Sequence, residues 1–141
     1  INIMTNISLS GNGSTPFQQL LGHNTNVLSA WNNLGEVLEG DNSLSASLKE
    51  QVRRTLAQKN GCEYCKAKGK PNHDLFDEKT SLAVGFAEVF LKQREEINES
   101  FFHVLKETFT DREISELCAF ISFTTASQYF GALLALKPNK E

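Results

Sequence analysis

Cysteine is scarce in this chain: three of its 141 residues are cysteines. So few cysteines do not make the disulfide framework of a small secreted domain. The opening residues, INIMTNISLSGNG, also lack the positively charged and apolar regions of a signal peptide. We therefore expect a cytoplasmic protein. In that reducing compartment, a close pair of cysteines is usually catalytic or metal-binding rather than structural.

Long apolar runs and an excess of positive charge are missing as well. No stretch approaches the roughly 20 apolar residues that a membrane-spanning helix needs. The formal net charge is −3, so the chain lacks the basic footprint of a nucleic-acid-binding protein. Neither a membrane nor a nucleic acid is therefore expected as a partner. A hydrophobic content of 40% suits one soluble globular domain with a substantial core.

Strand patterns are absent too, whereas helix signals follow one another along the chain. Residues 1–14 are rich in Gly, Ser and Asn and are predicted to form a flexible arm, followed by one helical domain over residues 15–141. Expected helix starts are Pro16 after Thr15, Asn24 or Thr25, Ser47 in a capping box with Glu50, Cys62, and Thr110 in a capping box with Glu113. Further helices are expected around residues 82–90 and 101–109. The fold class is all-α.

The last predicted helix runs from Thr110 to a point before Pro138. Between Leu117 and Leu136 it is expected to be apolar on several sides. A helix of that kind is buried centrally or lies at a subunit interface.

Cys62 and Cys65 stand two residues apart, directly after Gly61. At the start of a helix, free backbone N–H groups and the helix dipole favour negative charge, and therefore a thiolate. Lys59 and Lys66 act in the same direction. The spacing lets one thiolate react while its neighbour closes a disulfide with little movement of the chain. The pair therefore favours thiol redox chemistry.

Two other interpretations of the pair are open. A zinc site would take Cys62, Cys65 and His73 as ligands, but no second cysteine or histidine pair follows to complete it. Two inert buried thiols are the other alternative, which the lysine-rich surroundings oppose. Cys118 lies in an apolar segment and is interpreted as a packing thiol. No metal and no cofactor is predicted.

The segment LKEQVRRTLAQKNGCEYCKAKG resembles the core of the carboxymuconolactone decarboxylase / alkylhydroperoxidase D (AhpD-like) superfamily. Redox members of that family carry a Glu, eleven residues, a Cys, two residues, a second Cys, three residues and a His. Glu50, Cys62 and Cys65 match this spacing, but position 69 is Gly. The resemblance extends from about Pro16 to Leu136.

The resemblance implies an all-α subunit that assembles into a homotrimer or homohexamer. It also implies an antioxidant, peroxiredoxin-type activity in which Cys65 attacks a hydroperoxide and Cys62 resolves the product. Glu50 would start a proton relay, and a thiol or dithiol would act as reductant. Lactone decarboxylases of the superfamily generally do not rely on a cysteine pair, so the pair favours redox chemistry. A non-catalytic, redox-sensing oligomeric module and a decarboxylase remain alternatives.

Gly69 is where the sequence departs from the family pattern. If the chain reverses at Gly61, position 69 comes nearest to Glu50, at about 1.5 Å of rise per residue along both helices. A histidine there would connect the carboxylate to the thiols, and Gly69 cannot. Three replacements are predicted as alternatives: water at Glu50, His73 folding back, or the hydroxyl of Tyr64.

Overall fold

The computed structural model describes residues 4–139. Over these residues the chain forms seven α-helices and one short 3₁₀ helix, with no strand. In chain order the elements are α1 (Pro16–Leu21), α2 (Thr25–Glu39), α3 (Ala46–Ala57), α4 (Glu63–Lys66), η1 (His73–Leu75), α5 (Glu78–Gln93), α6 (Glu99–Lys106) and α7 (Asp111–Leu133). The predicted all-α class is confirmed.

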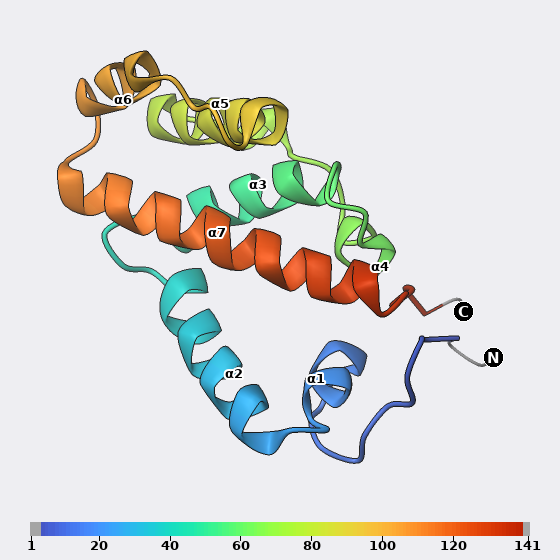
Figure 1. Cartoon of the computed structure of the whole chain (residues 1–141). Coiled ribbons are helices and arrows are strands. Elements are labelled where there is room, and N and C mark those ends of the chain that lie inside the picture. Colours follow the sequence, from blue (N-terminus) through green and yellow to red (C-terminus); the bar gives the residue numbers. More distant parts are fainter. Residues whose placement is uncertain (1–3, 140–141) are drawn as a thin grey trace.

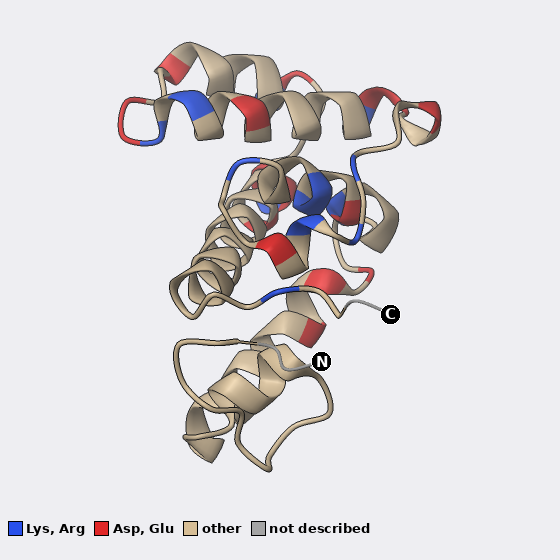
Figure 2. Ribbon diagram, turned by 90° about the vertical axis from the view of Figure 1, so that its right-hand side faces the viewer, with Lys and Arg blue, Asp and Glu red and all other residues tan. Residues whose placement is uncertain are grey.

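The helices are arranged in three tiers, which Figures 1 and 2 show from two directions. Helices α5 and α6 form the upper tier, α3 and α7 the middle tier, and α1 and α2 the lower one. Helix α3 packs against both α5 and α7, and α2 and α4 pack against α7. The long helix α7 therefore connects all three tiers.

The main hydrophobic core lies between α3, α5 and α7. Its buried members are Leu38, Leu44, Leu48, Val52, Leu56, Ala83, Val84, Phe86, Ala87, Leu105, Phe109, Ile114, Leu117, Phe120 and Ile121. Each large aliphatic or aromatic side chain buried in this way contributes about 1.5–3 kcal/mol relative to its exposed state. This cluster is the main source of stability, and it positions the remaining elements.

Polar N-caps begin the helices largely as predicted. Thr15 accepts a hydrogen bond from the backbone N–H of Gln18, Asn24 caps α2, and Thr110 forms a capping box with Glu113. The prediction for α3 is wrong, because Ser45 rather than Ser47 is its N-cap. Ser45 Oγ accepts from the N–H of Leu48 at 3.1 Å.

Helix α3 begins earlier than predicted because a second side chain helps its first turn. Asp41 Oδ1 accepts from the backbone N–H of Ala46 at 2.8 Å, so Asp41 and Ser45 together satisfy two of the free N–H groups. Glu50 therefore lies inside the helix and not at its cap. Its carboxylate is free to bind other groups.

Helix α7 has the predicted length but is not apolar on several sides. Its buried residues are Ile114, Leu117, Phe120, Ile121, Thr124, Thr125, Gln128 and Gly131. The second half of this buried face is thus polar or small, while Tyr129 and Leu133 are exposed on other faces. Among the described residues, no helix combines the length and the apolar character needed to cross a membrane.

Helix α2 of the lower tier buries few of its residues. Only Gly35 and Leu38 of α2 are buried, whereas Val27 and Leu34 are exposed. Along the segment before α1, the N–H of Asn6 donates to the carbonyl of Leu134 at 2.9 Å. Residues 1–3 of the predicted flexible arm lie outside the described residues, and the flexibility of the arm stays a prediction.

Candidate functional site

Cys62 and Cys65 form a disulfide, with their Cα atoms 5.2 Å apart. Gly61 allows the turn before them, because its φ of +79° lies in the left-handed region that glycine adopts without strain. Cys62 is the N-cap of the one-turn helix α4, and its Sγ accepts from the N–H of Cys65 at 3.2 Å. The predicted pair is thus capable of dithiol–disulfide chemistry.

The two sulfur atoms differ in their access to solvent. The exposed fraction is 1% for Cys62 and 8% for Cys65, and Cys65 but not Cys62 lines the pocket described below. The expectation that the surrounding lysines keep the pair from being buried is wrong. The surrounding lysines are exposed to solvent, whereas the cysteines and Ala57 form a small buried cluster against which Tyr64 and Ala132 pack.

A glycine of α7 allows this close packing. A Cβ atom at Gly131 would lie 2.6 Å from Cys62 Sγ and 3.8 Å from Cys65 Sγ. The first of these distances is far below an allowed contact. The backbone of α7 therefore covers Cys62, while Cys65 has open space on its other side.

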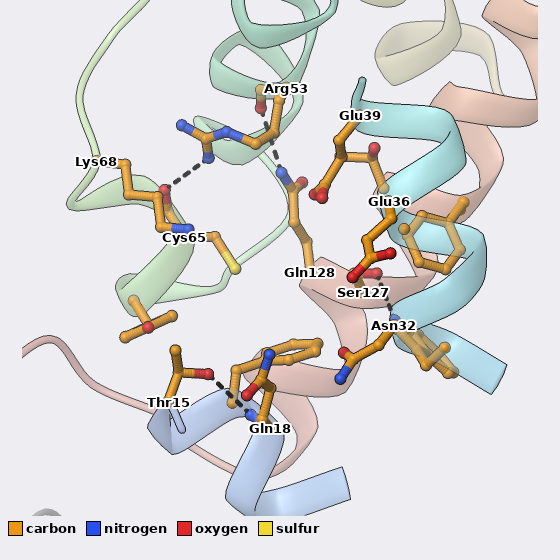
Figure 3. Close-up of a pocket in the computed structure, with 16 residues that line it drawn as sticks. Thr15, Gln18, Asn32, Glu36, Glu39, Arg53, Cys65, Lys68, Ser127 and Gln128 are labelled. Atoms are coloured by element: carbon orange, nitrogen blue, oxygen red, sulfur yellow. Dashed lines mark hydrogen bonds between the residues drawn. The ribbon is translucent and has the colours of Figure 1, made fainter. Parts of the chain in front are cut away.

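That space is a pocket of about 320 Å³, which we call the Cys65 pocket (Figure 3). One part of its wall is aromatic, and another part carries charge. The aromatic residues are Phe17, Trp31, Tyr64 and Phe123, and the charged ones are Glu36, Glu39, Arg53 and Lys68. The cavity thus offers apolar contact together with both signs of charge beside one sulfur atom.

Arg53 connects the pocket to the disulfide. Its Nη1 donates to the carbonyl oxygen of Cys65 at 3.1 Å, and its Nε and Nη2 donate to the carboxylate of Glu50 at 2.7 and 2.9 Å. On the opposite side, Gln128 Nε2 donates to the carbonyl of Arg53 at 3.2 Å, and Asn60 Nδ2 donates to Gln128 Oε1 at 2.8 Å. These bonds fix the backbone around Cys65 from α3 and α7.

Glu50 itself does not line the pocket. It also accepts a hydrogen bond from Arg54 Nε at 2.8 Å. Partial burial acts to raise the pKa of Glu50, but the hydrogen bonds from Arg53 and Arg54 outweigh this effect and lower its pKa to about 2. At neutral pH the group is a carboxylate held by two arginines. Such a group is a weak base and carries no proton to donate.

Arg54 lies between Glu50 and Gly69. A Cβ atom at Gly69 would be 3.6 Å from Arg54 Nη1. Position 69 is therefore near Glu50, as predicted, but the guanidinium of Arg54 lies between them. The φ of Gly69 is +114°, a conformation that favours glycine over any residue with a side chain. An arginine of α3 thus lies where the family pattern would place a histidine.

The other two predicted relay residues differ in position. His73 is exposed on η1 and does not line the Cys65 pocket. Its ring centroid is 4.7 Å from that of Phe76. Tyr64 is half-buried and lines the pocket. Within residues 4–139, no three His, Cys, Asp or Glu side chains lie close enough together to hold a metal ion.

Two acidic residues of the pocket were missed from the sequence, Glu36 and Glu39. Burial raises the pKa of Glu39, the charges of Lys68 and Arg53 oppose this effect, and the charge of Glu50 adds to it. Their position on the helix could have indicated them in the sequence. Both glutamates lie on the same side of α2 as Gly35, which packs next to the Phe123 ring.

Comparisons with known proteins identify the fold. No protein-family model matches the chain, and no curated protein matches it either. Two solved structures are similar. One is an uncharacterized peroxidase-related protein from Silicibacter sp. TM1040, with a TM-score of 0.73 and 21% identity, covering 86% of this chain and 75% of that one.

The second is an uncharacterized peroxidase-related protein from Ralstonia eutropha JMP134, described as an alkylhydroperoxidase AhpD core. Its TM-score is 0.70 and its identity 22%, and the match covers 86% of this chain and 75% of that one. At these identities the likeness concerns the fold. The chain has the AhpD-like fold that its sequence predicts.

Proposed function

We propose that the chain is a dithiol–disulfide oxidoreductase that reduces hydroperoxides through Cys62 and Cys65. The observation that carries this proposal is the asymmetry of the disulfide. One sulfur atom borders a pocket, and the other is sealed beneath α7. A two-cysteine peroxidase requires this difference in access, because one sulfur atom must contact the hydroperoxide, whereas the other needs to reach only the first sulfur atom.

In the reduced protein, the thiolate of Cys65 attacks the terminal oxygen of the hydroperoxide. The O–O bond breaks, an S–O bond forms, and the alkoxide leaves as an alcohol after taking up a proton. Cys62 then attacks Cys65 Sγ, the S–O bond breaks, and water leaves as the disulfide forms. An external thiol or dithiol reduces this disulfide by exchange and is itself oxidised.

Positive charge beside Cys65 supports this assignment. Lys68 lines the same pocket, and Arg53 binds the carbonyl oxygen of Cys65. Both cations favour a thiolate over a thiol. Glu50 then acts on the reaction through Arg53, whose guanidinium it holds in place. Its predicted role as the start of a proton relay stays a prediction.

The test is stopped-flow oxidation of the reduced protein by cumene hydroperoxide. We expect wild type to turn over with dithiothreitol as reductant, and Cys65→Ser to consume peroxide no faster than buffer. Without dithiothreitol, Cys62→Ser should consume one equivalent of peroxide and stop at the sulfenic acid of Cys65, because no resolving thiol remains, whereas wild type should stop at the disulfide. Cys118→Ser is the matched control and should behave as wild type.

Equal rates in wild type and Cys65→Ser would overturn the proposal. A lactone decarboxylase would keep its activity in both Cys62→Ser and Cys65→Ser. The same pair of variants therefore also tests the alternative reaction of the superfamily.

A further inference from the structure

A hydroperoxide releases an alkoxide when its O–O bond breaks, and an alkoxide is a poor leaving group unless it receives a proton. A positioned acid therefore accelerates this step, typically by a factor of about 10²–10⁴. The question of which residue supplies that proton rests on the function proposed above. It is open here because Gly69 has no side chain to take part in a relay.

Two of the residues predicted for a relay do not meet this need. Glu50 has a pKa of about 2 and lies outside the pocket, so it holds no proton at neutral pH. His73 also lies outside the pocket. Tyr64 lines it, with its ring packed against the cysteine cluster and Lys68 Nζ 5.6 Å from the ring centroid, so Tyr64→Phe is compared with Glu39→Gln in the test below.

Helix α2 provides the carboxyl groups that face Cys65. Figure 3 shows Glu36 and Glu39 extending from α2 into the pocket, toward the side where Cys65 and Gln128 lie. The carboxyl group of Glu39 lies over the preceding turn of α2, since a Cβ atom at position 35 would be in ordinary contact with Glu39 Oε2 at 3.7 Å.

Glu39 shares the Cys65 pocket with Arg53 and Lys68. Burial raises the pKa of Glu39, the positive charges of Lys68 and Arg53 oppose this effect, and the negative charge of Glu50 adds to it. Because the pKa is raised, the carboxyl group of Glu39 keeps its proton to higher pH than an ordinary glutamate does, in the cavity that Cys65 lines.

We propose that Glu39 is the general acid that protonates the alkoxide released when Cys65 attacks a hydroperoxide. Two electrons of the Cys65 thiolate form the S–O bond, and the pair of the broken O–O bond goes to the leaving oxygen. The proton of the Glu39 carboxyl group then moves to that oxygen and gives the alcohol. Glu39 is exposed at the pocket rim, so the carboxylate regains its proton from water before the next cycle.

The test compares two oxidants that differ in their leaving group. Cumene hydroperoxide releases an alkoxide, which needs a proton, and peracetic acid releases acetate, which does not. Each is mixed with reduced wild type, Glu39→Gln, Tyr64→Phe and the control Glu88→Gln, which changes an exposed glutamate of α5 outside the pocket. The oxidation of Cys65 is followed at several pH values. The alkylation rate of Cys65 by iodoacetamide, whose iodide leaves without a proton, reports whether the thiolate itself has changed.

Glu39→Gln should lose roughly 100-fold in its rate constant with cumene hydroperoxide, the scale of a lost general acid. Its rates with peracetic acid and iodoacetamide should equal those of wild type. Glu88→Gln should keep all three rates. With cumene hydroperoxide, the wild-type rate should rise with pH as the thiolate forms and fall again as Glu39 loses its proton, and the falling limb should vanish in Glu39→Gln.

Three results would overturn the inference. The first is an unchanged cumene hydroperoxide rate in Glu39→Gln. The second is an equal loss with both oxidants, which would indicate a general effect on the pocket. The third is a loss selective for cumene hydroperoxide in Tyr64→Phe but not in Glu39→Gln. A wild type that reacts with neither oxidant would instead overturn the proposed function itself, and the role of Glu39 with it.

Discussion

The two halves of the contact between α3 and α7 differ in the polarity and size of their buried residues. In the first half, Leu48 and Val52 of α3 belong to the same buried cluster as Leu117 and Phe120 of α7. In the second half, the buried residues of α7 are Thr124, Thr125, Gln128 and Gly131. Of these, Gln128 bonds Asn60 and the carbonyl of Arg53, and Gly131 lies against the disulfide.

The difference shows how one helix pair serves two purposes. The first half buries apolar area, which stabilises the fold. The second half buries less apolar area. It contains instead a glycine that packs against Cys62 and a glutamine that forms hydrogen bonds with Asn60 and with the carbonyl of Arg53. Stability should therefore depend mainly on the first half, and redox chemistry on the second.

The largest expected effect comes from a change in the apolar half. Leu117 is fully buried, and Leu117→Ala leaves a cavity that should lower the free energy of unfolding by about 2–5 kcal/mol. Urea denaturation measures this loss. Leu133→Ala, at a side chain that is 74% exposed, is the control and should change the free energy by less than about 0.5 kcal/mol. Similar losses in both variants would contradict the division.

A change in the second half should have a smaller effect on stability and a larger one on the disulfide. Gly131→Ala places a methyl group 2.6 Å from Cys62 Sγ, and this overpacking should cost about 1–3 kcal/mol. It should also slow the closure of the disulfide, which thiol titration after a peroxide pulse measures.

Gly85→Ala is the matched control for that substitution. Gly85 lies inside α5, and an added Cβ atom there meets no other atom within 4 Å. Alanine should therefore stabilise this helix by about 0.5–1 kcal/mol. If Gly131→Ala behaves like Gly85→Ala, close packing against the disulfide is not what requires a glycine at position 131.

The smallest expected effect concerns Glu50. Its side chain is 39% exposed, so solvent screens the ion pairs and Glu50→Gln should cost less than about 1 kcal/mol at pH 7. Because the folded-state pKa is about 2, below the ordinary 4.5, the contribution is present above pH 4.5 and disappears as the pH falls toward 2. The difference in urea midpoint between Glu50→Gln and wild type should therefore be smaller at pH 3 than at pH 7.

An exposed glutamate of α5 gives the control for this small effect. Glu88→Gln should shift the midpoint less than Glu50→Gln does at pH 7. A difference between Glu50→Gln and wild type that stays constant from pH 7 to pH 3 would show that the arginine pairs do not set the acid dependence.

Much of the fold was predictable because helix caps and glycines are local signals. Thr15, Asn24 and Thr110 begin their helices where the sequence places them. The start of α3 was not predictable in this way, because Ser45 and Ser47 are both suitable caps. A contact from Asp41, outside the helix, decides between them.

The candidate site was predictable in its sulfur chemistry and not in its acids. The spacing of Cys62 and Cys65 permits a disulfide by itself. The partners of Glu50 are two arginines of its own helix, of which one also donates to the carbonyl of Cys65 in α4 and the other to the carbonyl of Lys70 after it. Glu39 could not be found from its neighbours in sequence. Its relation to Cys65 exists only because α2 folds against α7.

The single tryptophan of the chain gives the pocket an optical signal of its own. Trp31 lines the Cys65 pocket, and its indole N–H donates to Ser127 Oγ at 3.0 Å, so the ring is held in one orientation. A disulfide quenches the emission of a nearby indole, and a dithiol quenches it less. Each half of the redox cycle should therefore change the intrinsic fluorescence, and oxidation can be followed in real time without dye or label.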